Sequence, residues 1–321
     1  MAGKFLTYPN SGSFLKTICV HSIVPILIGE AMGEGTSCPF WPLRFIFTDT
    51  NHLSMRYLVC CLSLLFAASV HAQDLTPKAA AAMPLGITDA SLFEQLMLTV
   101  PGVGSNARLT LEQQSVKSYM MPVRQVGSRG EGWSYALASC LEYYVNLRRN
   151  YKDNLSPDFI ALSVRAAGQT STLDNGLRML AGAGTVSAAI MPYDATEIPA
   201  AVYATTKYQI ANYLHIFRGF ATEREKVFEV RKALMRGNPV LIELAASPEF
   251  ASQGPALAWE PSGAPNQTYF LLVVGYDETR EAFELLGSFG PEWANNGYLW
   301  VSYDDFGQSA RNGYVLIPNN F

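Results

Sequence analysis

The sequence predicts an α+β protein with two lobes, a helical N-terminal lobe followed by a strand-rich C-terminal lobe. Helix signals dominate residues 88–236, whereas short β-rich runs separated by Gly, Pro, Asp and Asn dominate from Pro239 onward. A run of helices followed by a run of strands is typical of α+β proteins. No internal repeat or long low-complexity segment interrupts this order.

The helices of the first half are predicted from capping residues and stop signals. Three of the expected helices begin at a Ser, Thr or Asp that can accept a backbone hydrogen bond. The first expected helix is residues 88–99, which Pro101–Gly104 end, and the second begins at Leu155-Ser156 with Pro157 in its first turn. Leu173–Ala183 is the third, and Tyr203–Gln209 is expected to be helical from its composition. The last is Thr222–Arg236, which Gly237 ends.

One further helix carries an apolar stripe that indicates burial. Its apolar residues recur at spacings of three and four, as on one face of an α-helix. They are Trp133, Leu137, Cys140, Leu141, Tyr144 and Leu147. We therefore expect this helix to lie in the core.

The second half contains four predicted strands. All are short runs rich in β-branched and aromatic residues. They are Val240–Leu244, Tyr269–Val274, Ala282–Leu286 and Tyr298–Tyr303. The acidic pair Asp304-Asp305 after the last run is interpreted as a solvated loop.

The N-terminal 72 residues differ from the rest. Residues 1–54 show no sustained period and are interpreted as a non-native upstream extension. Residues 55–72 combine one positive charge, an apolar run of 14 residues and Val70-His71-Ala72 before Gln73. This pattern is typical of a secretory signal peptide, because ~20 apolar residues are needed to span a membrane. We therefore expect translation from Met55, export to the periplasm or medium, and no membrane span after cleavage.

The composition of the remaining residues, 73–321, limits the functions that the protein can have. Residues 73–118 are interpreted as an N-terminal extension, with Gln73–Met83 as a loose leader, and residues 119–321 as the main domain. Residues 1–72 hold four of the 23 basic and three of the 27 acidic residues, so 19 basic and 24 acidic residues follow them. This acidic balance does not suggest nucleic-acid binding. Only one cysteine, Cys140, and one histidine, His215, follow residue 72, so no disulfide, metal site or cofactor is expected.

Several motifs, taken together and in order, resemble the papain-type cysteine peptidase family. The resemblance extends over Met121–Tyr303. Its motifs are Pro122-Val123, Gly127-Ser128, Gly130 and Trp133; Leu141-Glu142; Leu155-Ser156; Val274-Gly275-Tyr276; and Ser288, Gly290, Trp293, Asn296, Gly297 and Tyr298. The resemblance implies a papain-like fold with a β-barrel-like C-terminal lobe and a cleft between the lobes.

The same resemblance implies that the catalytic residues are substituted. Gly132 stands at the position of the nucleophilic cysteine, Tyr269 at that of the histidine and Gly287 at that of the orienting asparagine. Glycine cannot attack a carbonyl, and a phenol with a pKa near ~10 is a poor base at neutral pH.

Further substitutions extend this pattern. Val126 stands at the position of the oxyanion glutamine, although a one-residue shift of the loop would bring Gln125 there. Phe289 replaces the tryptophan that shields the asparagine. Arg129 replaces a cysteine that is usually disulfide-bonded in the family.

A relocated nucleophile is disfavoured. Cys140 lies eight residues after Gly132, ~12 Å along the helix, and is interpreted as a core residue. His215 lies in an apolar stretch and is interpreted as a hydrogen-bonded structural histidine. Ser128 and Ser134 flank Gly132, but no histidine stands at the base position to activate a hydroxyl.

A hypothesis for the degenerate site follows from side-chain size. The Tyr269 ring would fill the space left by Gly132 and Gly287 and cap the helix N-terminus, or else it would simply be a strand aromatic facing the core. Glu131 would favour the helix dipole but repel an anionic substrate.

The sequence therefore predicts a pseudopeptidase that binds a peptide or protein ligand. The binding surface would lie around Gly127, Ser128, Gly130, Glu131, Trp133 and Phe289. The alternatives are an active hydrolase with a serine–histidine site, and a structural envelope protein with a closed cleft.

Overall fold

The computed structural model describes residues 80–103, 107–128 and 130–319, all within the unit His71–Phe321. The predictions for the upstream extension and the signal peptide lie outside the described residues. The helices are α3 Ala90–Leu96, α4 Ala107–Glu112, α5 Gly132–Arg149, α6 Pro157–Ala166, α7 Leu173–Gly182, α8 Glu223–Met235 and α9 Tyr303–Ser309, with short 3₁₀ helices at Lys117–Tyr119, Ala200–Ala204 and Pro248–Ser252. The strands are β1 Gln113–Ser115, β2 Ile210–Phe217, β3 Val240–Ala246, β4 Gln267–Asp277, β5 Ala282–Leu286, β6 Tyr298–Ser302 and β7 Ala310–Pro318.

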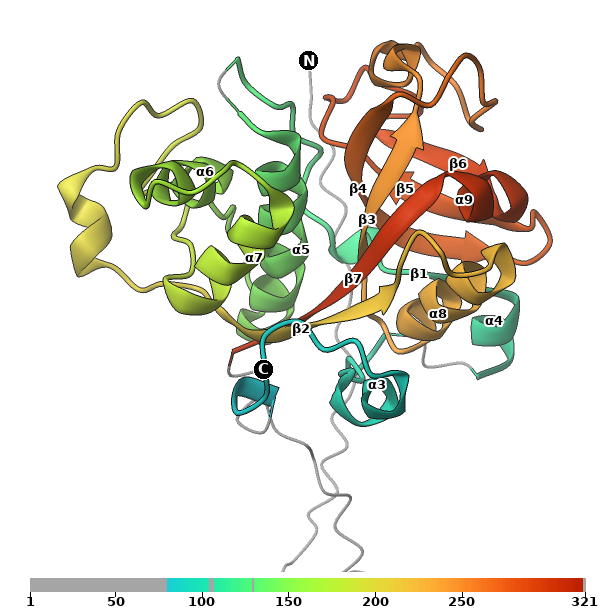
Figure 1. Cartoon of the computed structure of the whole chain (residues 1–321), viewed down its shortest axis with the longest axis horizontal. Coiled ribbons are helices and arrows are strands. Elements are labelled where there is room, and N and C mark those ends of the chain that lie inside the picture. The colour runs from blue at the N-terminus through green and yellow to red at the C-terminus, as the bar shows by residue number, and fades with distance from the viewer. Residues whose placement is uncertain (1–79, 104–106, 129, 320–321) are drawn as a thin grey trace, which may run out of the picture. The chain divides into compact units, whose positions relative to one another are not determined.

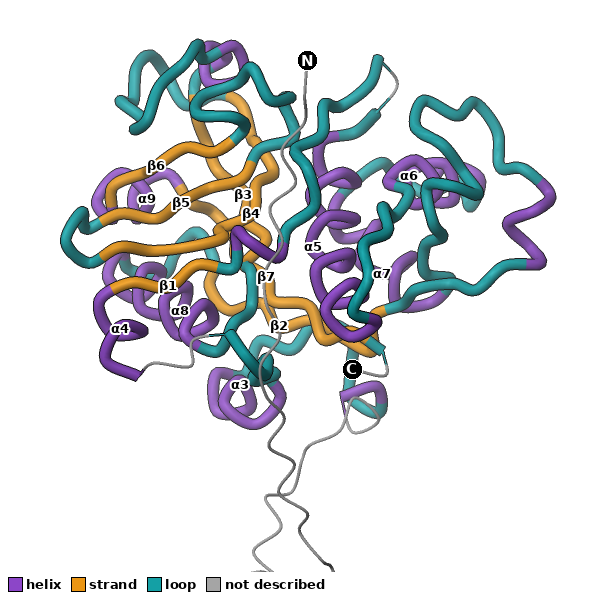
Figure 2. Tube along the Cα trace, turned by 180° about the vertical axis from the view of Figure 1, so that it is seen from behind, coloured by secondary structure: helices purple, strands orange, loops and turns teal. Residues whose placement is uncertain are grey.

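The strands form one antiparallel sheet in the order β2-β7-β3-β4-β5-β6, with β1 paired to β4. Helices α5, α6 and α7 lie together on one side of this sheet, as Figure 1 shows in green against the orange and red strands. Figure 2 shows the same division from behind. The predicted α+β architecture is therefore confirmed, although β1 and β2 come before α8, and α9 lies between β6 and β7.

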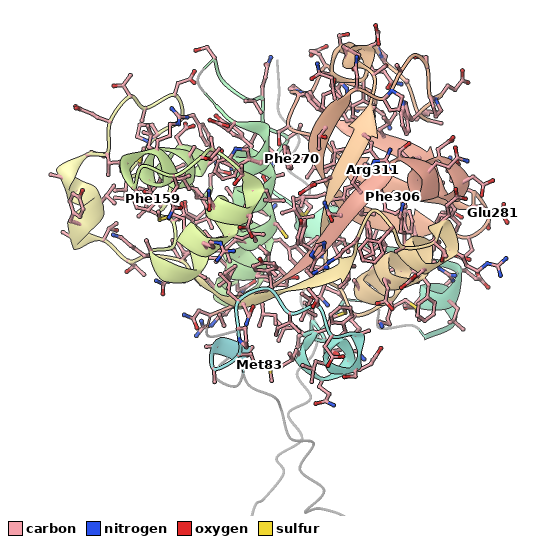
Figure 3. The ribbon with its side chains drawn as sticks, viewed as in Figure 1. Met83, Phe159, Phe270, Glu281, Phe306 and Arg311 are labelled. Carbon is pink, nitrogen blue, oxygen red and sulfur yellow. The ribbon has the colours of Figure 1, made fainter. Side chains whose placement is uncertain are left out.

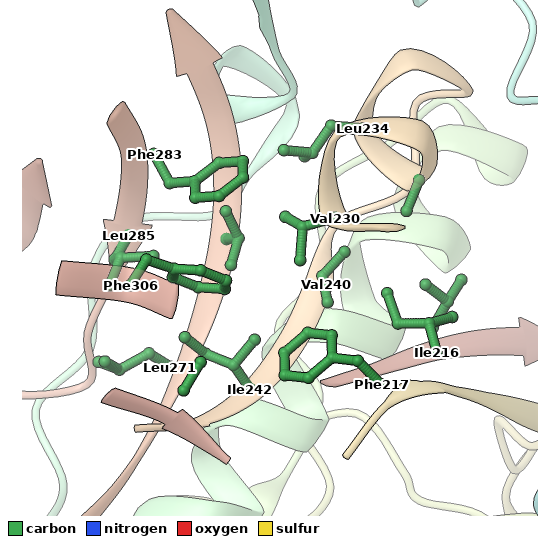
Figure 4. Packing of buried hydrophobic residues seen from close by; sticks show 14 of the residues in the cluster. Ile216, Phe217, Val230, Leu234, Val240, Ile242, Leu271, Phe283, Leu285 and Phe306 are labelled. Carbon is green, nitrogen blue, oxygen red and sulfur yellow. The ribbon is translucent and has the colours of Figure 1, made fainter. Parts of the chain in front are cut away.

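The sheet packs on both faces. One core cluster joins the sheet to α8 and α9, and Figure 4 shows Val230 and Leu234 of α8 above the strand residues Val240 and Ile242. A second cluster joins the opposite face to α5 and includes Leu272. Burial on both faces explains why the strands read as nearly continuous apolar runs rather than alternating ones.

Helix α5 is buried along most of its length. Its predicted apolar stripe is confirmed, with only Leu147 partly exposed. The helix ends at Asn150, which adopts the left-handed conformation (φ 51°) and whose N–H donates to the Leu147 carbonyl. Its N-terminus therefore projects from the core at Gly132, where the candidate site lies.

The segment before α3 is part of the core. Asn212 of β2 is fully buried; its side-chain amide donates to the carbonyls of Ala80 (2.8 Å) and Pro84 (3.1 Å) and accepts from the N–H of Gly86 (2.9 Å) and Tyr213 (2.9 Å). The prediction of a loose leader is thus wrong for Ala80, which is 1% exposed.

We expect Asn212→Ala to lower the free energy of unfolding by about 3 kcal/mol, because it leaves several buried backbone groups without a hydrogen-bond partner. Urea unfolding measures this loss. Asn266→Ala is the matched control, since Asn266 lies exposed in a loop and its loss should change stability by less than ~0.5 kcal/mol. Equal stability of the two variants would contradict the structural role of Asn212.

The capped helices are confirmed near their predicted bounds. Asp89, Ser156 and Thr222 each accept a backbone N–H at the start of α3, α6 and α8. The predicted helix over Tyr203–Gln209 is wrong: the chain forms a short 3₁₀ helix at Ala200–Ala204, and the following residues lead into β2. The Tyr208 backbone pairs with Thr185 instead of forming a helical turn, so contact with another segment overrides the local propensity.

The C-terminal part contains two elements that the sequence did not indicate. Asp304-Asp305 is not a solvated loop but the first turn of α9, where Ser302 accepts the N–H of Asp305 at 3.0 Å. Strand β7 lies between β2 and β3 and completes the sheet. Among the described residues, no helix has both the length and the hydropathy required to cross a membrane.

Candidate functional site

The loop that leads into α5 is held against a segment far along the chain. The Val126 N–H donates to the Ser288 carbonyl at 2.9 Å, and the Gly290 N–H donates to the Arg124 carbonyl at 3.0 Å. These bonds flank an antiparallel bridge between Gln125 and Phe289. Two of the motifs quoted above are therefore neighbours in space.

Gly132 begins α5 and is only partly buried. An ideal Cβ at this position would have a single neighbour within 4 Å, the Phe270 Cδ2 atom at 4.0 Å. No side chain caps the helix, because the Glu131 carboxylate does not accept from the first-turn N–H groups. The position predicted for a nucleophile is thus open and lies at a helix N-terminus.

Glu131 is held to one side of this helix start. Its Oε2 accepts from the Trp133 indole Nε1 at 2.9 Å, and its Oε1 lies 3.4 Å from Arg165 of α6. The carboxylate is therefore partly neutralised by Arg165. The predicted repulsion of anions at this point is correspondingly weakened.

The Tyr269 ring does not fill the space at Gly132, so that hypothesis is wrong. The Tyr269 hydroxyl donates to the carbonyls of Ser247 (3.1 Å) and Pro248 (3.3 Å), and the ring packs 5.0 Å from that of Phe250. Burial raises the pKa of this phenol. Tyr269 therefore agrees with the alternative interpretation, an aromatic strand residue that packs on the core.

Phe270, not Tyr269, is the side chain next to Gly132. Figure 3 labels Phe270 between α5 and the strands. Phe270 packs with the α5 cluster, as do Leu272 and Val274, whereas Tyr269 packs with the opposite cluster. The register of β4 against β5 shifts between Val273 and Gly275. Residues 269–274 alternate between the two faces of β4, so Tyr269 and Phe270 point to opposite faces, and Phe270 lies on the face that packs with α5.

The space beside Gly287 is filled by other side chains, unlike the space beside Gly132. An ideal Cβ there would lie 2.8 Å from Phe289 Cδ2 and 2.9 Å from Trp293 Cζ3. A cavity of only about 10 Å³ remains between this strand end and α5. The aromatic rings therefore occupy the volume that an asparagine side chain would need.

These rings belong to an aromatic cluster beside the site. Phe289 lies 4.8 Å from Trp293 and 5.8 Å from Tyr269, between ring centroids, and the Trp293 Nε1 donates to the Phe250 carbonyl at 2.8 Å. Phe289 and Tyr269 remain partly exposed. The cluster thus presents aromatic surface next to the site.

The other predicted site residues shape the loop. A Cβ at Gly127 would collide with the Asp194 carboxylate, and one at Gly130 would lie 2.7 Å from Tyr135 and 2.9 Å from Val126. A side chain at Gly127 would displace the Asp194 carboxylate, whereas Gly130 allows a close approach to the Tyr135 ring and to Val126. Ser128 is exposed, and Trp133 is buried against the helical lobe.

Gln125 remains exposed, with its Oε1 beside Gly290. An ideal Cβ at Gly290 would lie 3.2 Å from that oxygen. The sequence indicated Gln125 only as the residue that a loop shift would bring to the site. The structure pairs its backbone with Phe289, next to the aromatic cluster.

The sequence did not predict a buried ion pair, which lies between the loop that leads into α5 and α5 itself. Arg124 bonds to the Glu142 carboxylate of α5, which also accepts from the Leu155 N–H at 2.7 Å. Burial raises the pKa of Glu142 to about 7, against the lowering effects of Arg124 and the Leu155 N–H. The sequence signal for this pair was Glu142 itself, because a glutamate on a helix predicted to be buried usually has a charged partner.

The cysteine and histidine that follow residue 72 both lie in structural roles. Cys140 is fully buried, and burial raises the pKa of its thiol. The His215 Nε2 lies 3.0 Å from Asn312 Oδ1, and its ring stacks on Tyr314 at 4.5 Å; burial lowers its pKa. Both residues match their predicted structural interpretation.

The serine–histidine alternative has no geometric support. Ser134 is buried and its hydroxyl donates to the Glu131 carbonyl at 2.9 Å, whereas His215 bonds to Asn312. Each side chain is therefore engaged in a separate network. Within the described part of the chain, no group of three or more His, Cys, Asp or Glu side chains is placed to hold a metal ion.

The fold and motifs agree with a family comparison. The model of the papain family of cysteine proteases matches residues 110–317, which is more than half of the chain. The chain belongs to the papain family. A curated relative, the gamete and mating-type specific protein A of Dictyostelium discoideum, is 23% identical over 203 residues, which cover 61% of this chain and 44% of that protein. The chain thus spans less than half the length of this relative.

Solved structures of papain-family proteases share the fold. Procathepsin L 3 of Tenebrio molitor aligns with a TM-score of 0.54 at 17% identity, over 75% of this chain and 78% of its own. A cysteine protease of Carica candamarcensis aligns with a TM-score of 0.52 at 16% identity, over 65% and 99%. Xylellain of Xylella fastidiosa aligns with a TM-score of 0.52 at 17% identity, over 73% and 95%. At such identities the likeness shows the fold alone.

Because the chain belongs to the papain family, the start of α5 can be compared with the family's catalytic position. The site positions Gly132, Tyr269 and Gly287 were assigned by resemblance, and this assignment remains a prediction. In this papain-family chain, Gly132 lies at the start of the helix that packs against the sheet, and Phe270 lies opposite it. The family's chemistry requires a thiol and a base at this place.

Proposed function

We propose that the chain is a papain-family pseudopeptidase that binds a peptide or protein partner beside the N-terminus of α5. One observation carries the proposal: the cysteine and histidine that follow residue 72 are both engaged elsewhere, while Gly132 offers no nucleophile. A site that has lost its nucleophile and base retains its shape and its hydrogen-bonding backbone.

The surroundings of Gly132 suit an uncharged or apolar segment. Phe270, Tyr269 and Phe289 are all partly exposed, and the first-turn N–H groups of α5 have no side-chain cap. Aromatic side chains contribute large contact areas at binding sites, and backbone N–H groups at a helix start can donate hydrogen bonds to peptide carbonyls. These features support peptide binding rather than a closed structural scaffold.

The test uses the full chain with a broad peptide library, assayed in parallel for cleavage and for binding. We expect no turnover above the blank, together with saturable binding of some peptides. Phe270→Ala should weaken that binding, because it removes the ring that faces Gly132. Phe228→Ala is the matched control, since Phe228 is an exposed aromatic residue on α8.

The other functional classes give different results. Turnover that Ser134→Ala or His215→Ala abolishes would establish the hydrolase. Absence of both turnover and binding would favour the structural envelope protein. Equal loss of binding in Phe270→Ala and Phe228→Ala would contradict the proposed location.

We also propose that the protein is exported to the periplasm or medium. The support is the signal-peptide pattern of residues 55–72, which lie outside the described structure. N-terminal sequencing of the protein from the cell exterior should begin at Gln73. Recovery of a product that still carries residues 1–54 would overturn this proposal.

A further inference from the structure

A separate pocket lies far along α5 from Gly132, at the opposite end of the helix. It lies between the last turn of α5, residues 206–209 and the end of β7, and it has a volume of about 150 Å³. That is roughly ten times the ~10–15 Å³ that a water molecule needs. The pocket is therefore large enough for a small ligand.

Three cationic residues line this pocket, and no Asp or Glu does. Arg148 and Arg149 come from the last turn of α5, and Lys207 comes from the segment before β2. The chain as a whole has a formal net charge of −4, so composition does not account for this concentration of positive charge. The lining also includes the hydroxyl-bearing residues Thr206 and Tyr208.

The wall of the pocket is fixed by hydrogen bonds. The Tyr208 backbone exchanges two bonds with Thr185, each 2.8 Å long. The Arg149 Nη1 donates to the Tyr208 hydroxyl at 2.8 Å, and the guanidinium lies 4.7 Å from the centre of the Tyr208 ring. Arg149 is thus oriented before any ligand binds, which reduces the entropy lost on binding.

The other two cations have no carboxylate partner within the described residues. Arg148 is exposed and forms no ion pair there, and the Lys207 amine lies over the rings of Phe159 (5.5 Å) and Tyr203 (5.7 Å). Arg148 can therefore turn towards a ligand without breaking an existing contact. Asp153 interacts electrostatically with Arg149 but does not line the pocket, so only cationic charged side chains line it. A pocket lined by charges of one sign favours a ligand of the opposite sign.

The helix dipole explains only part of this arrangement. The C-terminus of a helix carries about half a negative charge, which favours Arg148 and Arg149 in the last turn. It does not explain Lys207, which comes from another segment. Three positive charges also exceed the dipole's half charge, so the pocket remains net positive.

We propose that this pocket binds a phosphate group, either as free phosphate or as the monoester of a small molecule. A guanidinium group presents two parallel N–H donors that match two phosphate oxygens. The hydroxyl group of Thr206 adds a donor for a remaining oxygen. This site is independent of the peptide site proposed beside Gly132.

The experiment measures binding of inorganic phosphate and of glycerol phosphate to the full chain by calorimetry at fixed ionic strength. We expect saturable binding that Arg148→Gln weakens roughly tenfold, through loss of a charge-assisted pair. Arg224→Gln is the matched control, because Arg224 is also an exposed helical arginine that forms no ion pair within the described part of the chain. It should change the affinity less than twofold.

Each outcome is decisive. Tighter binding of glycerol phosphate identifies a monoester ligand, and equal or weaker binding identifies free phosphate. Absence of saturable binding by both compounds overturns the proposal, as does equal weakening by Arg148→Gln and Arg224→Gln. Lys207→Gln tests the pocket from a second segment and should also weaken binding.

Discussion

Gly132→Cys is expected to create a reactive thiol at the start of α5 without unfolding the protein. A side chain there meets only Phe270, at 4.0 Å, and a helix N-terminus stabilises a thiolate. Cys140 is fully buried and its thiol pKa is raised, so it should react slowly. We expect alkylation at residue 132 to be on the order of a hundredfold faster than at Cys140. Peptide mapping by mass spectrometry measures both rates in one sample.

The matched control is Gly287→Cys. Its Cβ would lie within 2.9 Å of both Phe289 and Trp293, so we expect a loss of about 1–3 kcal/mol in the free energy of unfolding. Gly132→Cys should change that free energy by less than ~1 kcal/mol. The reverse order of stability would contradict the described packing.

Restored peptidase activity is not expected from Gly132→Cys. Phe270 faces the new thiol, and an aromatic hydrocarbon cannot accept its proton. Hydrolysis of library peptides by this variant would therefore show that another group acts as the base. Measurable thiol reactivity without hydrolysis is the expected result.

Arg124→Met is expected to lower the free energy of unfolding by about 3–5 kcal/mol at pH 8, because it leaves the buried Glu142 carboxylate without its counter-charge. Urea unfolding measures the loss. The matched control is Arg178→Met, which removes an exposed i,i+4 pair with Asp174 and should change stability by at most about 0.5 kcal/mol. Similar losses in the two variants would contradict the structural importance of the buried pair.

The deficit of Arg124→Met should shrink as the pH falls from 8 to 5. Burial raises the pKa of Glu142 to about 7 in the folded protein, and removal of Arg124 raises it further. Between the unfolded value, ~4.3, and the folded value, the folded state binds more protons than the unfolded state. Its stability therefore rises as the pH falls, and it rises more in the variant. A deficit that stays constant between pH 8 and pH 5 would overturn this linkage.

Local signals in the sequence predicted the capped helices and four of the strands. Capping depends on neighbouring residues, so Ser156 and Thr222 identified their helices directly. Strand β7 and helix α9 depend on pairing and packing with distant segments. The local residues of these elements could not reveal that context.

The sequence by itself determined the family, the order of the two lobes and the absence of a cysteine at the start of α5. These properties depend on residue identity and spacing, which are read directly from the chain. Gly132 is glycine whatever the packing, and Cys140 lies too far along its helix to replace a nucleophile there.

Only the tertiary structure decided what surrounds Gly132. Phe270, rather than Tyr269, lies on the face of β4 that packs with α5, and the rings of Phe289 and Trp293 occupy the space beside Gly287. The physical reason is that the facing of Phe270 towards Gly132 depends on packing between segments far apart in the sequence, and the filling of the space beside Gly287 depends on how the rings of Phe289 and Trp293 fold back over it. Such contacts are set by the packing of the whole core rather than by local propensity.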